Sequence, residues 1–347
     1  MTEPQKELRR GWTTGACATA AVKAALEALW SGAPPKRVRL TLPRGERPVF
    51  DVAELGLGPG WAEAGIVKDA GDDPDVTHGA LIRARVTPGG EGVRFRAGAG
   101  VGTITRPGLP LPPGEPAINP VPRRMMTEVV AEQAARFARP GGVEITLSVP
   151  GGEALAAKTW NPRLGIIGGL SILGTTGVVR PFSCAAWIAS IHRGVDVARA
   201  AGLTHVAGCT GATSERAVQG LYGLPDHAML DMGDFAGGML KYLAKHPVAR
   251  VTIGGGLGKL SKLGQGAMDL HSKRGGTDFA ALAELVGEPK VARMNTVLEA
   301  FETLGTPLAQ AIADRALETV KARFGGEIRF DVVAVSRAGA VVARAGP

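Results

Sequence analysis

The sequence predicts two domains, an α+β domain over residues 1–180 and an α/β domain with a mainly parallel sheet over residues 181–347. Three observations support this division. A chain of 347 residues is too long for one small core. The first half mixes isolated helices with short alternating strands, which is typical of α+β domains. The second half repeats a strand–loop–helix unit three times, which is typical of parallel sheets.

Hydrophobic periodicity defines the elements of the first half. In chain order it predicts a helix over 15–31, strands over 37–42 and 80–86, a Gly/Pro-rich loop over 98–122, a helix over 123–138 and a strand over 143–149. The first helix ends at Gly32 and Pro34, residues that stop helices. This order indicates an antiparallel or mixed sheet. The boundary is expected around 178–181.

The second half begins with a helix over 183–201. Its three units are expected at 204–207 into 212–221, 228–231 into 234–245, and 250–253 into 257–268. Helices near 278–287, 291–303 and 307–323 follow, and strands near 328–335 and 340–343 close the chain. Short apolar strands that lead into glycine-containing loops and helices predict a Rossmann-like domain.

Composition narrows the function. The chain carries 40 basic and 32 acidic residues, a net charge of +8 that is scattered along the sequence. It has no run of Lys and Arg of the kind that binds nucleic acid, so an anionic small molecule is the favoured substrate. High glycine content, 50 residues, suits an enzyme whose sites are built from loops.

Cysteines and apolar segments indicate the compartment. Cys17, Cys184 and Cys209 are far apart and form no Cys-x-x-Cys pair, so neither a zinc cluster nor a disulfide framework is expected. A reducing cytoplasm fits this pattern. The polar N-terminal segment lacks the apolar stretch of a signal peptide, and no segment is expected to span a membrane.

Two copies of Thr-Thr-Gly stand out. Thr13, Thr14 and Gly15 precede one Ala-rich helical segment, and Thr175, Thr176 and Gly177 precede another. The second copy ends the glycine-rich run 161–177. Hydroxyls and glycine before a helix can hold an anion or a nucleotide-like ligand on free backbone N–H groups. Two ordinary capped helices would give the same pattern, and both interpretations stay open.

The three strands of the second half end in loops with glycine. Ligands of parallel sheets bind at these carboxyl ends, so the loops are the expected cofactor site. The candidates for it are Gly208, Thr210, Gly211, Asp231 and Gly233. The later loop 254–259 is not a phosphate-binding Walker loop, because its spacing is too short.

Residues 68–79 hold four aspartates and His78. They could bind a hard metal such as Mg, supply a general acid or base through Asp72 or Asp73, or form a solvated turn that extends one or two side chains to a site. In the second half, Lys259 and His271 follow a sheet loop and could bind carboxylates or exchange protons. Arg106, Arg123 and Arg163 stand in Gly/Pro-rich loops, where arginines are good carboxylate clamps.

Several of these segments together resemble the cobalt-precorrin-5B C(1)-methyltransferase family, of the CbiD type, from anaerobic cobalamin biosynthesis. The resemblance is carried, in order, by residues 11–21, 68–79, 98–123, 159–181, and the Gly258-Lys259-Leu260 to His271-Ser272 block. Cys209 stands where the family usually has Asn, and Gly256 stands where many members have His.

The resemblance implies methyl transfer from S-adenosylmethionine to carbon 1 of cobalt-precorrin-5B, which gives cobalt-precorrin-6A. It implies an anionic tetrapyrrole as substrate, with Arg106, Arg123, Arg163 and Lys259 contacting its carboxylate arms and Thr13, Thr14, Thr175 and Thr176 as further contacts. The donor would lie in the loops at 208–215 and 231–235. Asp72, Asp73 or His271 could serve as a base or proton relay. No protein-bound metal is required, because the substrate's nitrogens hold the cobalt.

Two other functions are consistent with single features. The glycine-rich run and the acidic stretch would suit a small-molecule phosphotransferase that uses ATP and Mg, and the net charge alone would suit an RNA-binding module. Neither accounts for the ordered resemblance. The sequence leaves open whether the protein forms a homo-oligomer or contacts other enzymes of the cobalamin pathway.

Overall fold

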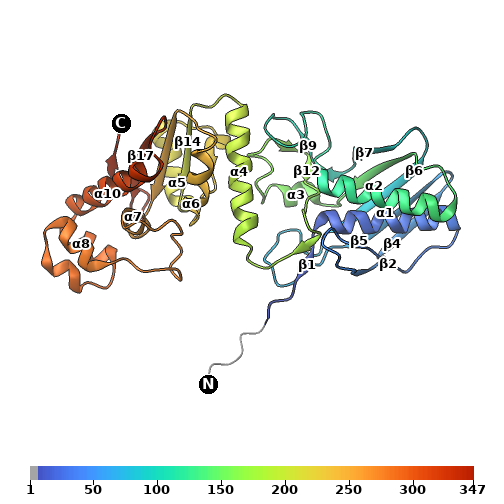
Figure 1. The fold of residues 1–347 in the computed structure, drawn as a ribbon, viewed down its shortest axis with the longest axis horizontal. Coiled ribbons are helices and arrows are strands. Elements are labelled where there is room, and N and C mark those ends of the chain that lie inside the picture. Colours follow the sequence, from blue (N-terminus) through green and yellow to red (C-terminus); the bar gives the residue numbers. More distant parts are fainter. Residues whose placement is uncertain (1–6) are drawn as a thin grey trace, which may run out of the picture. The chain divides into compact units, whose positions relative to one another are not determined.

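A computed structural model describes residues 7–347, and the first part of the polar N-terminal segment, residues 1–6, lies outside the described residues. The chain divides into two compact units, Met1–Ser183 and Cys184–Pro347, which are called unit 1 and unit 2 below (Figure 1). No helix among the described residues is both long and apolar enough to cross a membrane.

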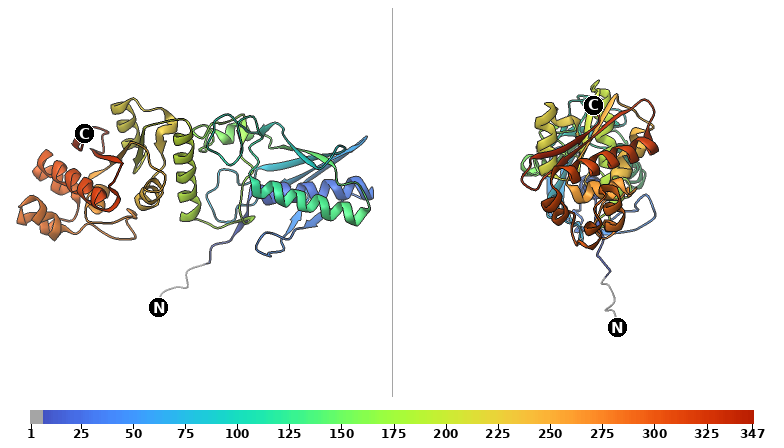
Figure 2. Two further views of the ribbon diagram at one scale, coloured as in Figure 1. Left: turned by 45° about the horizontal axis from the view of Figure 1, so that its top comes forward. Right: turned by 90° about the vertical axis from the view of Figure 1, so that its left-hand side faces the viewer.

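Unit 1 is built on a five-stranded sheet with two long helices on one of its faces (Figures 1 and 2). Across the sheet the strands run β4 (Glu54–Gly58), β5 (Trp61–Val67), β6 (Leu81–Pro88), β10 (Val143–Ser148) and β7 (Val93–Ala97). Only the β10–β7 pair is parallel. The helices of the unit are α1 (Thr14–Ser31), α2 (Pro120–Phe137) and the short α3 (Gly152–Ala156).

The core of unit 1 lies between this sheet and its helices. Alternation places Val143, Ile145 and Leu147 of β10 on the buried face. Helix α1 contacts β5, β6 and α2, and its inner face consists largely of alanines with Val22 and Leu26. Small side chains allow the helix to approach the sheet closely, so α1 is a buried support for whatever its N-terminus holds.

Four short strand pairs complete unit 1. They are β1 (Gly11–Trp12) with β13 (Val178–Val179), β2 (Arg37–Arg39) with β3 (Val49–Asp51), β8 (Gly100–Val101) with β12 (Gly169–Leu170), and β9 (Thr103–Ile104) with β11 (Ile166–Ile167). The pairing with β8 explains one glycine of the run 161–177, because a Cβ at Gly169 would collide with the Gly100 backbone. Gly174 likewise leaves room for the Thr13 side chain. Much of the glycine content of this run therefore serves close contacts within unit 1.

Unit 2 contains a second five-stranded sheet. Across it the strands run β15 (Met229–Leu230), β14 (His205–Cys209), β16 (Arg250–Gly255), β17 (Arg329–Val335) and β18 (Val341–Ala345). The first four are parallel, and β18 is antiparallel to β17. The helices are α4 (Cys184–Ala200), α5 (Ala212–Tyr222), α6 (Ala236–Leu243), α7 (Leu257–Gly264), α8 (Phe279–Val286), α9 (Val297–Leu304) and α10 (Thr306–Phe324), with 3-10 turns at Asp226–Ala228 and Pro289–Arg293.

The strand order of unit 2 reverses once. The chain goes from β14 outward to β15, then returns to β16 on the other side of β14. Parallel α/β sheets bind ligands outside the carboxyl ends of the two strands at such a reversal. Here Cys209 ends β14 and lies opposite Gly254, one residue before the end of β16, and the Thr210 N–H donates to the Gly254 carbonyl at 2.9 Å.

The structure corrects several elements expected from the sequence. The helix expected over 291–303 is interrupted, and α9 begins only after Thr296, whose hydroxyl accepts from the Glu299 N–H while the Glu299 carboxylate accepts from the Asn295 N–H. This Thr-x-x-Glu pair is close to a capping box, a helix-start signal present in the sequence. The helix expected to 268 ends at Gly264. Strands β5 and β7 were not expected, and in β5 three of the four buried positions hold small residues, Ala62, Ala64 and Gly65.

Candidate functional site

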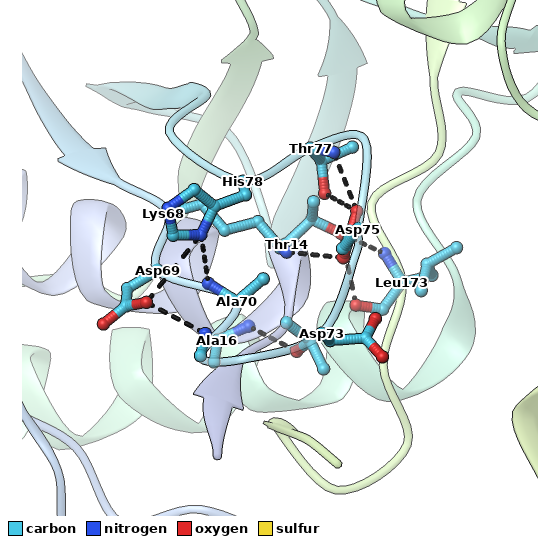
Figure 3. Close-up of polar contacts among 12 residues, drawn as sticks. Thr14, Ala16, Lys68, Asp69, Ala70, Asp73, Asp75, Thr77, His78 and Leu173 are labelled. Atoms are coloured by element: carbon cyan, nitrogen blue, oxygen red, sulfur yellow. Dashed lines mark hydrogen bonds and ion pairs between the residues drawn. The ribbon is translucent and has the colours of Figure 1, made fainter. Parts of the chain in front are cut away.

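The acidic stretch 68–78 folds back over the start of α1 around a buried ion pair (Figure 3). The Lys68 ammonium lies 2.6 Å from the Asp75 carboxylate, and only 1% of the Lys68 side chain is exposed. The other Asp75 oxygen accepts from the backbone N–H and hydroxyl of Thr77. Burial raises the pKa of Asp75, but the bonds from Lys68 and Thr77 outweigh it, so the pKa lies below its usual value.

Asp69 fixes the N-terminal segment to the same loop. Its carboxylate is held by the Arg9 guanidinium and by the Gly71 N–H, and these bonds lower its pKa against the opposing effect of burial. His78 lies 3.8 Å from Asp69, and its Nδ1 accepts from the Ala70 N–H at 3.1 Å (Figure 3). In the neutral ring the proton is therefore on Nε2.

Asp72 and Asp73, the expected acid or base, both accept backbone N–H groups. Asp72 accepts from Arg9 at 2.7 Å, and Asp73 accepts from Phe182 at 2.8 Å. The two carboxylates thus connect the loop to the chain on either side of the β1–β13 pair. Across residues 7–347 no group of three or more His, Cys, Asp or Glu side chains is arranged to hold a metal ion.

The two Thr-Thr-Gly copies meet in space. The Thr13 N–H donates to the Gly177 carbonyl, and the Gly15 N–H donates to the Leu173 carbonyl. The Thr14 hydroxyl accepts from the Leu173 N–H at 2.9 Å, and Thr13 caps α1 by accepting from the Ala16 N–H (Figure 3). Thr13 and Thr14 are buried, and the bonds of Thr14 reach the backbone of Leu173, just before the second copy.

The second copy differs from the first. Thr175 is exposed, and Thr176 bonds the backbone of Val178 in a local turn. The helix that follows, α4, starts seven residues later at Cys184, so these threonines do not cap it. Of the four threonines, Thr175 is therefore the one whose side chain lies open at the surface.

Two of the expected arginine clamps lie together and the third does not join them. Arg106 donates to the Arg163 carbonyl at 3.1 Å, and the Arg163 guanidinium lies 4.5 Å from the Trp160 ring. Arg123 instead donates to the Ile118 and Pro116 carbonyls and pairs with Glu115 at 2.8 Å. These bonds hold Arg123 at the start of α2, and its expected role as a clamp stays a prediction.

In unit 2, the glycines at the strand reversal fall into two groups. A Cβ at Gly208 would collide with the Met239 sulfur, and a Cβ at Gly254 would lie 2.7 Å from the Cys209 sulfur, so packing requires both. A Cβ added at Gly211, Gly256 or Gly258 would have no neighbouring atom closer than 4.0 Å, and none of the three has a left-handed backbone conformation. Neither packing nor backbone conformation requires glycine at these three positions, which begin α5 and α7.

Lys259 connects the loops that follow β14 and β15. Its ammonium donates to the Thr210 carbonyl at 3.1 Å and pairs with Asp234 at 2.7 Å. The Gly233 N–H donates to the Cys209 carbonyl, and the Asp231 carbonyl accepts from the Trp187 indole. The loops that were expected to hold the cofactor are thus joined to each other. Lys259, which was expected to bind the substrate, is bonded to the same loops.

His271 lies on an exposed turn, where its Nδ1 accepts from the Lys273 N–H, and the preceding Leu270 N–H donates to the Asp234 carbonyl of the loop after β15. Sequence reasoning gave no role to Lys68, Asp234 or Trp187. Lys68 opens the acidic stretch and follows an apolar strand, which could have indicated a buried partner for one of the aspartates. Cys17 lies in the first turn of α1, and burial raises its pKa to about 12, so it remains a neutral thiol.

The Lys68–Asp75 pair predicts a large stability effect. Asp75→Asn leaves a buried ammonium without a counter-charge, and breaking such pairs costs about 3–5 kcal/mol in the free energy of unfolding. Asp51→Asn, which removes an exposed partner of Arg37, should cost about 1 kcal/mol or less. Denaturant unfolding at pH 7 measures both. Equal losses in the two variants would contradict the role given to Lys68.

The Lys68–Asp75 pair also predicts how the stability of the protein depends on pH. The pKa of Asp75 is lower in the folded protein than its usual value of 3.8. The contribution of ionised Asp75 to the free energy of unfolding is therefore fully present above pH 3.8, and it is lost as the pH falls through the folded pKa. The stability gap between the wild-type protein and Asp75→Asn should therefore close below about pH 4. A gap that stays constant under acid would show that ionised Asp75 does not carry the effect.

The glycines of unit 2 predict a contrast between two alanine variants. Gly208→Ala should lower the melting temperature by several degrees, because overpacking against Met239 costs about 1–3 kcal/mol. Gly211→Ala should leave it unchanged or slightly raised, because its Cβ has room. Calorimetric melting of both variants checks this. A comparable loss in Gly211→Ala would show that the fold itself requires that glycine.

Family models match both parts of the chain. Residues 1–181 match the family described as CbiD, and residues 269–346 match the one described as CbiD, C-terminal domain. A crystal structure described as cobalamin biosynthesis protein (cbiD) from Archaeoglobus fulgidus is 28% identical, with a TM-score of 0.43, and the match covers 77% of this chain and 83% of that one.

Curated relatives match over nearly the whole length. Proteins from Brucella anthropi and Brucella canis are each 58% identical, over 99% and 98% of this chain respectively and 97% of their own. Both carry the name cobalt-precorrin-5B C(1)-methyltransferase. With a family model over residues 1–181 and relatives of this similarity, the chain belongs to the CbiD family.

Proposed function

We propose that this protein transfers a methyl group from S-adenosylmethionine to carbon 1 of cobalt-precorrin-5B. The names of its close relatives support the reaction, and the glycines at the strand reversal of unit 2 support a donor site there. The names of the close relatives give the phosphotransferase alternative no support.

The observation that carries the donor site is the free space at Gly211, Gly256 and Gly258. A glycine that neither conformation nor packing requires suits a backbone that a ligand approaches closely. All three lie at the ends of β14 and β16, where the strand order reverses. We propose that unit 2 is a Rossmann-like domain and that these loops, with Thr210, Asp231 and Gly233, hold the donor.

The backbone there also suits a ligand with a carboxylate. Helices α5 and α7 begin at Gly211 and Gly256 without a side-chain cap, so their first N–H groups remain available. Lys259 adds a positive charge beside Asp234 and fixes the Thr210 carbonyl. This arrangement positions the loops before any ligand is bound, which reduces the ordering cost of binding.

Methyl transfer requires mainly that the protein position the two reactants. The donor, when bound, supplies a methyl group already activated on a sulfonium; the new bond joins that methyl to the substrate carbon, and the bonding pair of the S–CH₃ bond stays on sulfur. The protein must hold the carbon in line with the methyl and exclude water, which can supply most of the rate. Asp72, Asp73 and His271 remain the proposed groups for a proton transfer at the substrate.

We propose that Arg106 and Arg163 contact the carboxylate arms of the macrocycle. They lie together on neighbouring loops of unit 1, where Arg106 donates to the Arg163 carbonyl, and Arg123 lies apart from them at the start of α2. Exposed Thr175 belongs to the same proposal as a further polar contact. The net charge of +8 favours association with a polyanionic substrate.

The donor site predicts selective loss of donor binding. Gly211→Ala and Gly256→Ala should each raise the dissociation constant of S-adenosylhomocysteine about tenfold or more, because each places a methyl group where the ligand approaches the backbone. Isothermal titration calorimetry of the full chain measures this. Gly141→Ala, another glycine with room for a Cβ, is the matched control and should bind like the wild-type protein. Unchanged binding in both variants would place the donor elsewhere.

Loss of Arg106 or Arg163 should weaken binding of the corrin substrate and leave binding of the methyl donor unchanged. Arg106→Ala and Arg163→Ala should each weaken binding of the corrin substrate about tenfold, since a hydrogen bond to a charged group contributes about 1.5–3 kcal/mol. Binding of S-adenosylhomocysteine should not change. Arg39→Ala serves as the control for loss of one surface charge. Substrate titrations monitored by corrin absorbance would refute the clamp if all three variants bind equally.

A further inference from the structure

Trp187 lies at the edge of the unit 2 sheet that carries the proposed donor loops. It belongs to the first turn of α4, which ends at Ala200 shortly before β14 begins at His205. In the last turn of α4, Arg199 donates to the carbonyl of Pro247, shortly before β16. The end of α4 therefore lies at the amino ends of the strands, and its start lies at their carboxyl ends.

The indole of Trp187 is held against the loop that follows β15. Its N–H donates to the Asp231 carbonyl at 2.8 Å, and the Phe235 ring lies 6.1 Å from it between centroids. Gly233 has the left-handed conformation that glycine favours, and a Cβ there would lie 3.4 Å from the Cζ2 atom of the indole. The side chain thus has a fixed position, although 46% of Trp187 is exposed.

The loop beneath the indole is bonded to the rest of the proposed donor site. The Gly233 N–H donates to the Cys209 carbonyl at the end of β14. Asp234 pairs with Lys259, whose ammonium also donates to the Thr210 carbonyl. The indole therefore lies beside the backbone that connects the ends of β14 and β15.

The place of Asp231 indicates which part of a nucleoside would reach this indole. In nucleotide-binding parallel sheets, an acidic residue about 20 residues after the first glycine-rich loop bonds a ribose hydroxyl. Asp231 follows β15, the strand next in the chain after β14, and its own carbonyl holds the Trp187 indole. A base attached to a ribose at Asp231 would have an aromatic ring beside it.

We propose that Trp187 binds the adenine of the methyl donor by stacking its indole on the purine ring. This inference rests on the proposed function and deepens it, because it assigns the residue that recognises the nucleoside. Stacked aromatic rings gain from buried area and from their offset π faces. The bond to the Asp231 carbonyl fixes the indole before the ligand binds, which reduces the ordering cost.

Isothermal titration calorimetry of the full chain with S-adenosylhomocysteine tests the stacking. Trp187→Leu keeps an apolar side chain without a π face and should raise the dissociation constant about tenfold. Trp187→Phe keeps an aromatic ring and should raise it by no more than about threefold. Both variants lack the N–H that bonds Asp231, so equally weak binding in both would show that Trp187 acts by positioning the loop, and would overturn the stacking.

Tryptophan fluorescence gives a readout that a purely structural role would not change. The other four tryptophans of the chain, at positions 12, 30, 61 and 160, belong to unit 1. A purine in contact with an indole quenches its emission, so S-adenosylhomocysteine should quench the wild-type protein. Trp187→Phe should lose most of this quenching while it still binds the ligand. Trp61→Phe is the matched control and should keep it.

Failure of the stacking and failure of the donor site give different results. If the wild-type protein does not bind S-adenosylhomocysteine, the proposed donor site is overturned and this inference with it. If the wild-type protein binds, but Trp187→Leu binds equally well and Trp187→Phe keeps the full quenching, only the role of Trp187 is overturned.

Discussion

The organisation of unit 1 depends on the hydrogen bonds that join the start of α1 to residues 171–179. The Thr14 hydroxyl and the Gly15 N–H bond the Leu173 backbone, and β1 pairs with β13 just beyond. Because the partners are far apart in the chain, these bonds close the unit. They also fix where the acidic stretch lies, since Gly11 packs so closely on Ala70 that a Cβ would collide with it.

This closure gives the acidic stretch a definite architecture. Lys68 and Asp75 form its buried centre, while Asp72 and Asp73 bind the backbone on both sides of the β1–β13 pair. Carboxylates held in this way keep a fixed position. The stretch therefore forms a turn, one of the three interpretations that its sequence allowed. An acid or base role for Asp72 or Asp73 stays a prediction, and the described residues offer no cluster of three side chains for a metal site.

Sequence patterns predicted the elements that follow a regular period and missed those that depend on distant partners. The alternation over 143–149 corresponds to β10, and the glycine-punctuated apolar segments of the second half correspond to β14, β15 and β16. Strand β5 was missed because three of its four buried residues are the small Ala62, Ala64 and Gly65, which give a weak hydrophobic pattern, and α1 packs against this strand. The break before α9 was missed although Thr296 and Glu299 signal it.

The candidate sites show the same limit. Residue type and loop location suggested Arg106, Arg123 and Arg163 equally, yet only the fold reveals that Arg123 is bonded to Glu115 and nearby carbonyls. Likewise, sequence could not separate glycines that packing requires, such as Gly208, from those with free space, such as Gly211. That separation depends on Met239 and other neighbours far along the chain.

A crystal structure of the full chain with S-adenosylhomocysteine would test the central claim most directly. The account predicts ligand density against the backbone of Gly211, Gly256 and Gly258, at the ends of β14 and β16. Density for the ligand at any other place, with these three glycines still uncovered, would contradict it.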